Sequence, residues 1–303
     1  MSVMGRICLL GFGEVGGALS SGLAVLRDVD LVAWDWLFDT PASRPSLQVL
    51  QHGHVRRTES AQQAAVGCDL VISAVTAAQA LDAARSVLPG LEKNAWFLDL
   101  NSVSPETKRE LAKAVSAAGG RFVEAAVMSA IAPRGMASTI LAGGPLATEF
   151  LPLGKSLGFS RLQLCSEEYG LAAATKMCRS VVVKGVETLL AEALLAARHY
   201  GVEDDVLASL EDLFPRPDWS HHARYMIARS VQHGVRRAEE MREVARTVAE
   251  AGLEPLMSTA CAQRQQWAAQ FAAALEHESL NTMLDAILAA NSLLVNQGEQ
   301  SIA

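Results

Sequence analysis

The stretch LLGFGEVGGALSSGL, residues 9–23, decides the fold of this chain. It begins at the end of an apolar run and continues into a helical pattern, with three glycines between them at the spacing G-x-G-x-x-G. The first glycine permits a tight turn, the second lets the backbone approach a pyrophosphate, and the third lets the helix pack closely on the strand. Free N–H groups at the helix N-terminus then favour an anion. We therefore expect a dinucleotide-binding loop that contacts its cofactor through Gly11, Phe12, Gly13, Glu14, Val15 and Gly16.

An acidic residue follows the next strand-like run. The segment VDLVAWD ends in Asp35, nineteen residues after Gly16. A carboxylate at this place can accept both ribose hydroxyls of NAD and repels the 2′-phosphate of NADP. Arg44 could bind that phosphate if its loop folded back, although a solvated loop residue is the interpretation that we favour. We expect NAD as the cofactor, and NADP stays open.

The first half of the chain alternates apolar runs with helical stretches. The runs RICLLG, VDLVAWD, CDLVISAV and AWFLDLN are continuous and bounded by turn residues, which is typical of strands buried on both faces. Further strand-like runs are RFVEAAVM, ASTILAGG and RLQLCS. The pattern predicts a doubly wound, mostly parallel α/β sheet of the Rossmann type over residues 1–165.

The period changes to a helical one after residue 165. Ser166 is a credible N-cap, and Gly201 is a natural stop, so we expect one long helix over about residues 166–200. At ~1.5 Å per residue this helix would be ~50 Å long, enough to link two domains. Nearly everything beyond it has helical periodicity. Residues 166–303 are therefore predicted to form an all-α domain.

The composition limits the function classes. The net charge of −7 argues against a general nucleic-acid binder, but a small anionic substrate can still find a locally basic site. The five cysteines are scattered without metal-ligand spacing, so we expect neither disulfides nor a metal site. We find no signal-peptide pattern and no apolar run of membrane-spanning length. We expect a soluble, cytoplasmic protein without a membrane partner.

Four motifs stand in a familiar order. After the glycine loop come VISAVT (residues 71–76), DLNSVSP (residues 99–105), EAAVMSA (residues 124–130) and GLAAATK (residues 170–176). In this order the chain resembles the β-hydroxyacid dehydrogenase and 6-phosphogluconate dehydrogenase superfamily, in particular a branch with a divergent C-terminal helical domain. The resemblance implies that Val75, Thr76 and Ser102 contact the cofactor, with Ser102 on its nicotinamide side. For Val75 and Thr76, ordinary packing at a strand end is the equal alternative.

The substrate motif departs from the family pattern D-A-P-V-S-G-G. Met128 stands where the family has serine, and Ser129 stands where it has the first glycine. The resemblance still implies that both residues line the substrate pocket. The alternative for Ser129 is a serine that caps a backbone group at the strand end.

The motif GLAAATK resembles the catalytic G-x-G-x-x-x-K helix start of the family. It implies that Lys176 is the general acid/base, and that Ser180, one turn further along, binds substrate in place of the usual asparagine. Partial burial would lower the pKa of the lysine toward working pH. Taken by itself, Lys176 would more often be a long apolar stem with a solvated amine.

The helical pattern of residues 231–252 offers two more candidates for substrate binding. His233 and Arg237 lie on a flank of this helix. The resemblance implies that relatives carry a Lys-Asp pair on this helix, which Glu239 and Glu240 replace here. Arg237 could bind a substrate carboxylate, and an ion pair is the equal alternative. We expect Glu187 to pair with Lys184, three residues earlier.

These observations predict an NAD(P)-dependent oxidoreductase. It would act on the CH–OH group of a small, anionic substrate such as a 3-hydroxy acid, and the resemblance implies a homodimer. Two alternatives stay open: an imine or ketone reductase on the same fold, and a dinucleotide-binding dimer without catalytic turnover.

Overall fold

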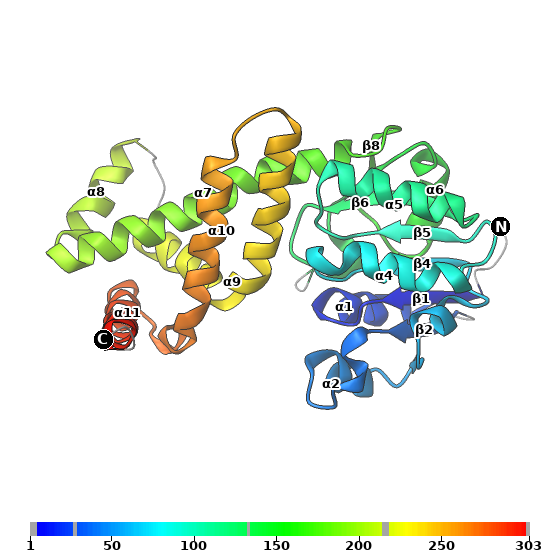
Figure 1. Ribbon diagram of the computed structural model, residues 1–303, viewed down its shortest axis with the longest axis horizontal. Coiled ribbons are helices and arrows are strands. Elements are labelled where there is room, and N and C mark those ends of the chain that lie inside the picture. The colour runs from blue at the N-terminus through cyan, green and yellow to red at the C-terminus, as the bar shows by residue number, and fades with distance from the viewer. Residues whose placement is uncertain (1–4, 27–28, 132–133, 214–217, 301–303) are drawn as a thin grey trace. The chain divides into compact units, whose positions relative to one another are not determined.

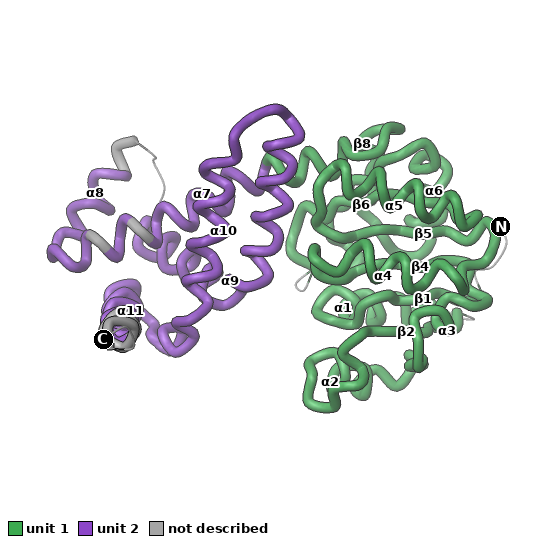
Figure 2. The backbone as a smooth tube through the Cα atoms, in the orientation of Figure 1, with its two compact units in different colours: residues 1–178 green, residues 179–303 purple. Residues whose placement is uncertain are grey.

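The computed structural model describes residues 5–26, 29–131, 134–213 and 218–300. The chain divides into two compact units, residues 1–178 and residues 179–303 (Figure 2). The sequence placed the domain boundary at residue 165, whereas the division into compact units falls thirteen residues later, inside a helix.

The first unit contains one eight-stranded sheet in the order β3-β2-β1-β4-β5-β6-β7-β8 (Figure 1). Its strands are β1 Arg6–Leu10, β2 Asp30–Trp34, β3 Val55–Arg57, β4 Leu70–Ser73, β5 Trp96–Asp99, β6 Arg121–Val127, β7 Ile140–Gly143 and β8 Leu162–Ser166. All neighbouring strands pair in parallel except β6 and β7, which are antiparallel. The chain crosses from β3 to β4 on the other side of β1, and ligands bind at such a switch point in open α/β sheets.

Helices cover both faces of this sheet. They are α1 Glu14–Leu23, α2 Arg44–Gln51, α3 Ala61–Ala65, α4 Ala80–Val87, α5 Pro105–Ala117 and α6 Ala147–Ser156, with short 3₁₀ turns η1 Trp36–Asp39, η2 Ala77–Gln79, η3 Leu88–Gly90 and η4 Gly135–Ala137. One hydrophobic cluster joins the sheet to α1, α2 and α6, and a second joins it to α3, α4 and α5. The predicted doubly wound fold is confirmed.

The sequence patterns did not resolve three elements of this unit. Strand β3 has only three residues, and its Arg56 and Arg57 side chains are exposed, so it has no apolar run. The sequence indicates a loop around Arg44, but Arg44 is the first residue of helix α2. Helix α6 contains Pro152, which masks its helical pattern.

The start of the long helix was predicted too early. Ser166 belongs to β8, and its hydroxyl accepts a hydrogen bond from the Glu168 N–H at 3.0 Å in a local turn. Gly170 then adopts a left-handed φ of +97°, which ends the turn, and α7 runs over Leu171–Tyr200. The expectation of a helix from Ser166 is therefore wrong by five residues.

The second unit is helical, as predicted. It contains the remainder of α7, then α8 Glu203–Leu213, α9 Trp219–Glu250, α10 Leu256–Ala268, the 3₁₀ segment η5 Ala269–Glu276 and α11 Leu280–Gln300. A hydrophobic cluster that includes Leu194, Ile227 and Leu284 forms its core. Within the described ranges, none of the helices combines the length and the apolar character that a membrane span requires.

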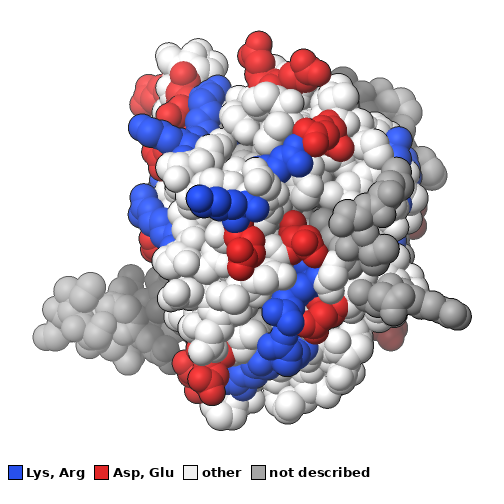
Figure 3. Space-filling model, turned by 90° about the vertical axis from the view of Figure 1, so that its right-hand side faces the viewer, with Lys and Arg blue, Asp and Glu red and all other residues white. Residues whose placement is uncertain are grey.

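Charged side chains of both signs are interspersed on the face of the molecule that Figure 3 shows. Pairs such as Arg6 with Asp30 and Arg109 with Glu106 join neighbouring charges in the first unit. This mixture is typical of a solvated surface.

Candidate active site

The glycine loop lies at the carboxyl end of β1, and its first and third glycines are required by the fold. Gly11 has a φ of +94°, and a Cβ there would lie 2.5 Å from the Ala74 carbonyl oxygen. A Cβ at Gly16 would lie 2.2 Å from the Gly11 carbonyl oxygen. Both positions therefore exclude any side chain.

The second glycine of the loop, Gly13, is not required by the packing of the fold. Gly13 is the N-cap of α1 in an extended conformation, and a Cβ there would meet nothing within 4 Å. The protein leaves this space open beside the first N–H groups of α1, where an anion is favoured. Glu14 and Val15 begin α1 beside this space, and both are partly buried.

Asp35 joins the glycine loop to the end of β2. Its carboxylate is nearly buried, with one oxygen accepting from the Phe12 N–H at 2.8 Å and the other from the Leu37 N–H at 2.9 Å. Each carboxylate oxygen keeps a lone pair that can accept a ribose hydroxyl. The open space at Gly13 and this acid fit the pyrophosphate and the ribose of a dinucleotide.

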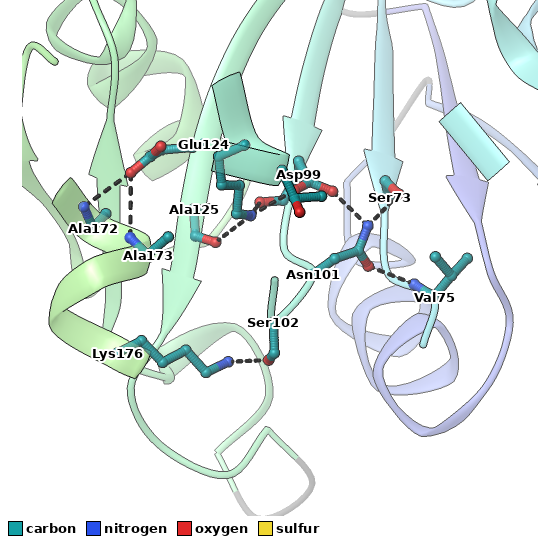
Figure 4. A network of polar contacts seen from close by, with 12 residues as sticks. Ser73, Val75, Asp99, Asn101, Ser102, Glu124, Ala125, Ala172, Ala173 and Lys176 are labelled. Carbon is teal, nitrogen blue, oxygen red and sulfur yellow. Dashed lines mark hydrogen bonds and ion pairs between the residues drawn. The ribbon is translucent and has the colours of Figure 1, made fainter. Parts of the chain in front are cut away.

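The loops after β4 and β5 are joined by Asn101. Its Oδ1 accepts from the Val75 N–H at 2.7 Å, and its Nδ2 donates to Ser73 Oγ at 2.9 Å and to Asp99 Oδ1 at 2.5 Å (Figure 4). Val75 also lies against the glycine loop, because a Cβ on Gly11 would be 2.8 Å from its Cγ1. Thr76 is exposed and precedes η2. The predicted residues Gly11 and Val75 are therefore brought together.

A buried ion pair fixes the loop after β5. Lys108 Nζ donates to Asp99 Oδ2 at 2.5 Å, to the Asp99 carbonyl at 3.0 Å and to the Ala125 carbonyl at 3.3 Å. Both side chains are essentially inaccessible to solvent. All three ammonium hydrogens have acceptors, which a buried charge requires. This network supports the loop that carries Ser102.

Lys176 and Ser102 meet directly. Lys176 Nζ donates to Ser102 Oγ at 2.5 Å, and both side chains are partly buried (Figure 4). Both residues belong to the first compact unit. The amine is therefore held at the carboxyl edge of the sheet, where an amine and a hydroxyl in contact can exchange protons.

The predicted substrate residues Met128 and Ser129 continue β6 beyond its last residue. The Met128 N–H donates to the Thr139 carbonyl at 2.8 Å, and Ser129 Oγ accepts from the Thr139 N–H at 3.1 Å. The Ser129 hydroxyl thus caps a backbone group, which was the alternative interpretation. Its contact with a substrate stays a prediction.

The remaining substrate candidates lie in the second unit. Ser180 is on α7, one turn after Lys176, and is partly buried. His233 is partly buried on α9. Arg237 is buried and forms an ion pair with Glu187, so its charge is matched inside this unit. Substrate contacts of Ser180 and His233 stay predictions.

The expected pairing of Glu187 with Lys184 is wrong. Lys184 is buried and donates to Glu240 at 2.6 Å, while Glu187 pairs with Arg237. Burial lowers the pKa of Lys184, and the nearby Glu240 carboxylate opposes this effect. Both ion pairs therefore join α7 to α9, and neither is formed between two residues of α7.

Sequence reasoning missed four polar residues that organise the site: Asn101, Asp99, Lys108 and Glu124. Glu124 was the detectable one, since a carboxylate inside the apolar run RFVEAAV has to find buried partners. Within the described ranges, no group of three or more His, Cys, Asp or Glu side chains could hold a metal ion.

The sheet order, the glycine loop and Asp35 together define a dinucleotide-binding α/β protein. Residues 6–149 match the NAD binding domain of 6-phosphogluconate dehydrogenase, and residues 197–268 match a domain of unknown function (DUF1932). The predicted NAD-binding domain is therefore confirmed.

Two solved structures are similar over nearly the whole chain. A conserved hypothetical protein from Sinorhizobium meliloti is 35% identical, with a TM-score of 0.70 over 94% of this chain and 96% of that one. The conserved protein MTH1747, described as a protein of unknown function with structural similarity to 3-hydroxyacid dehydrogenases, is 33% identical, with a TM-score of 0.64 over 88% of this chain and 97% of that one. The chain belongs to this 3-hydroxyacid dehydrogenase-like family, within the 6-phosphogluconate dehydrogenase superfamily.

Curated relatives are more distant. The cytokine-like nuclear factor N-PAC of Xenopus tropicalis is 27% identical over 68% of this chain, and the mitochondrial 3-hydroxyisobutyrate dehydrogenase of Drosophila melanogaster is 24% identical over 68%. The matched parts span 38% and 62% of these two relatives.

Proposed function

We propose that the protein is an NAD(P)-dependent oxidoreductase that transfers a hydride between nicotinamide and a small hydroxylated substrate, a 3-hydroxy acid or a related alcohol. The observation that carries this proposal is the contact of Lys176 Nζ with Ser102 Oγ. It supplies a titratable amine at the sheet edge where a Rossmann fold binds its ligand. The family membership and the 3-hydroxyisobutyrate dehydrogenase relative support the substrate class.

Each part of the site would have one task. Asp35 would accept the ribose hydroxyls, and the N-terminus of α1 beside Gly13 would hold the pyrophosphate. NAD, when bound, supplies the hydride acceptor or donor. Asn101 holds the loops after β4 and β5 together, and so keeps Val75 and Ser102 at one edge of the sheet.

Lys176 would move the proton. When the substrate alcohol is oxidised, the neutral amine accepts the hydroxyl proton, and when the carbonyl is reduced, the ammonium returns it. Ser102 Oγ holds the amine in place and keeps its own hydrogen for a second partner. Such proton transfer typically increases the rate about 10²–10⁴-fold.

A panel of 3-hydroxy acids, amino alcohols and aldehydes with NAD(H) and NADP(H) tests this function. We expect oxidation of a 3-hydroxy acid with NAD, and a fall in kcat of about 10²–10⁴-fold for Lys176→Met. The dissociation constant of NADH should stay unchanged in this variant, because none of the cofactor-holding groups is altered.

The matched control is Lys113→Met, since Lys113 is an exposed lysine on α5 of the same unit. It should leave both turnover and NADH binding unaltered. Full turnover by Lys176→Met would remove the lysine from the mechanism. Tight NADH binding without turnover on the panel would favour the non-catalytic dinucleotide binder.

Three finer assignments also belong to this proposal. We infer that the substrate is anionic, that Met128, Ser129, Ser180 and His233 are candidates for contact with it, and that the protein acts as a cytoplasmic homodimer. The departure of Met128 and Ser129 from the family motif points to a substrate different from that of the named relatives.

A further inference from the structure

Glu124 is a fully buried carboxylate in the middle of the apolar strand β6. Its Oε2 accepts from the Gly170 N–H at 2.5 Å, and its Oε1 accepts from the N–H groups of Ala172 and Ala173 at 2.9 and 3.3 Å. Ala172 and Ala173 lie in the first turn of α7 (Figure 4), and Gly170 directly precedes this helix. The carboxylate therefore lies at the positive end of the helix dipole, where an anion is stabilised without a cationic side chain.

The backbone is shaped for this contact on both sides. Gly170 adopts a left-handed φ of +97°, which presents its N–H to the carboxylate. On β7, a Cβ at Gly143 would lie 2.6 Å from Glu124 Oε1, so only glycine leaves room. Tyr169 adds a second contact, because its hydroxyl donates to the Phe122 carbonyl at 3.3 Å. The first turn of α7 is thus attached to the sheet at several points.

Lys176 follows directly from this turn. It stands four residues after Ala172 and three after Ala173, which places it one helical turn further on the same side of α7. A shift of the anchored turn would therefore move the Lys176 backbone with it. Its amine reaches Ser102 Oγ at 2.5 Å, and Ser102 directly follows Asn101, whose side chain is hydrogen-bonded to Asp99.

We propose that Glu124 is the positioning residue of the catalytic lysine: by binding the first N–H groups of α7, it holds the Lys176 amine against Ser102. This inference rests on the proposed role of Lys176 for its catalytic meaning, but the placement itself can be measured without turnover. It predicts that the position and reactivity of one amine depend on a carboxylate that touches neither substrate nor cofactor.

The test compares Glu124→Gln and Glu124→Asp with the wild-type protein. Glutamine keeps the length but turns an N–H donor toward N–H groups, and aspartate keeps the charge but is one methylene too short. Acetic anhydride labels each lysine at a rate that mass spectrometry reads, with the exposed Lys113 and Lys155 as internal references. Ser60→Ala is the matched control, because it removes the N-cap of α3, where Ser60 Oγ accepts from the Gln63 N–H at 3.2 Å.

We expect the labelling rate of Lys176 relative to Lys113 and Lys155 to rise several-fold in Glu124→Gln and less in Glu124→Asp. Ser60→Ala should leave that ratio unchanged. With the substrate found in the panel, kcat should fall about 10²-fold in Glu124→Gln, while the dissociation constant of NADH stays constant. A lower unfolding temperature with an unaltered Lys176 ratio and unaltered kcat would show a merely structural role and overturn the proposal.

Hydrogen exchange of the wild-type protein keeps the inference testable if Glu124→Gln does not fold. The amides of Gly170, Ala172 and Ala173 should exchange slowly, although N–H groups of a first helical turn ordinarily have no intrahelical acceptor. Rapid exchange at all three would overturn the anchoring. If instead the labelling ratio changes while Lys176→Met retains turnover, the positioning stands and the proposed function fails.

Discussion

The fold controls the protonation of His52, which lies beside the glycine loop. His52 Nδ1 lies 2.8 Å from Ser20 Oγ, and its ring contacts the ring of Phe12 in the loop. Burial lowers the pKa of His52 below its ordinary value of 6.5, and the neighbouring His54 lowers it further. The folded state therefore favours the neutral imidazole.

This pKa shift makes the free energy of unfolding depend on pH. The contribution of His52 is fully present above about pH 6.5 and is lost as the pH falls through the lower folded-state pKa, because the unfolded state binds the proton more tightly. Urea unfolding at about pH 7.5 and about pH 5 should show a smaller loss of stability for His52→Asn than for wild type. An identical loss in both proteins would exclude His52 as a source of the acid sensitivity.

The strand–loop–helix unit formed by β1 and α1 separates the needs of the fold from the needs of the ligand. Gly11 and Gly16 face backbone atoms, whereas Gly13 faces open space. Substitution of the first kind of glycine should harm folding, and substitution of the second kind should harm binding only.

We predict that Gly13→Ala changes the free energy of unfolding by less than about 1 kcal/mol, because the extended backbone accepts alanine at a helix N-cap. Its methyl group would occupy the space beside the α1 N-terminus, so the dissociation constant of NADH should rise about tenfold or more. Gly11→Ala, with its positive φ and the nearby Ala74 carbonyl, should lose about 1–3 kcal/mol of stability. Equal NADH affinity of Gly13→Ala and wild type in a fluorescence titration would contradict this division.

A buried ion pair joins helices α7 and α9 of the second unit. It can be tested whether Arg237 in this pair stabilises the fold or binds substrate. Arg237 on α9 and Glu187 on α7 are both almost inaccessible, and Gln265 on α10 lies 3.5 Å from the same carboxylate. Removing Arg237 leaves the buried Glu187 carboxylate with only the more distant Arg229, whose Nε lies 3.9 Å away, as a cationic partner.

Arg237→Met should therefore destabilise the protein by about 3–5 kcal/mol, and the double variant Glu187→Leu, Arg237→Met should recover most of this loss. Chemical denaturation measures both effects. A structural pair predicts normal turnover in the double variant. Loss of turnover together with normal stability would instead assign Arg237 to substrate binding, the other alternative that the sequence left open.

Over the whole chain, the sequence predicted what depends on local pattern. The glycine spacing, the apolar strands and the acid at residue 35 each follow from neighbouring residues, and they located the Rossmann unit and its cofactor loop. The start of α7 was missed because Gly170, and not the N-cap signal at Ser166, sets it. The resemblance pointed to Lys176, and the structure adds its contact with Ser102.

The polar contacts that organise the site could not be predicted, because their partners are far apart in the sequence. Glu124 meets Gly170 across 46 residues, and Lys176 meets Ser102 across 74. Lys184 and Glu187 each pair with a residue of α9 and not with each other. The partner of a buried charge therefore depends on the packing between elements. A charged residue in an apolar run indicates that a buried partner exists, but the sequence does not identify that partner.

The most direct measurement is a crystal structure of the protein with NAD and the substrate identified in the panel. We predict that Lys176 Nζ lies within hydrogen-bond reach, about 2.6–3.2 Å, of the substrate oxygen that gains or loses the proton, with the reacting carbon facing the nicotinamide. A bound nicotinamide ring at the opposite end of the sheet, or a substrate oxygen that contacts only other groups while the lysine amine lies in solvent, would contradict the account.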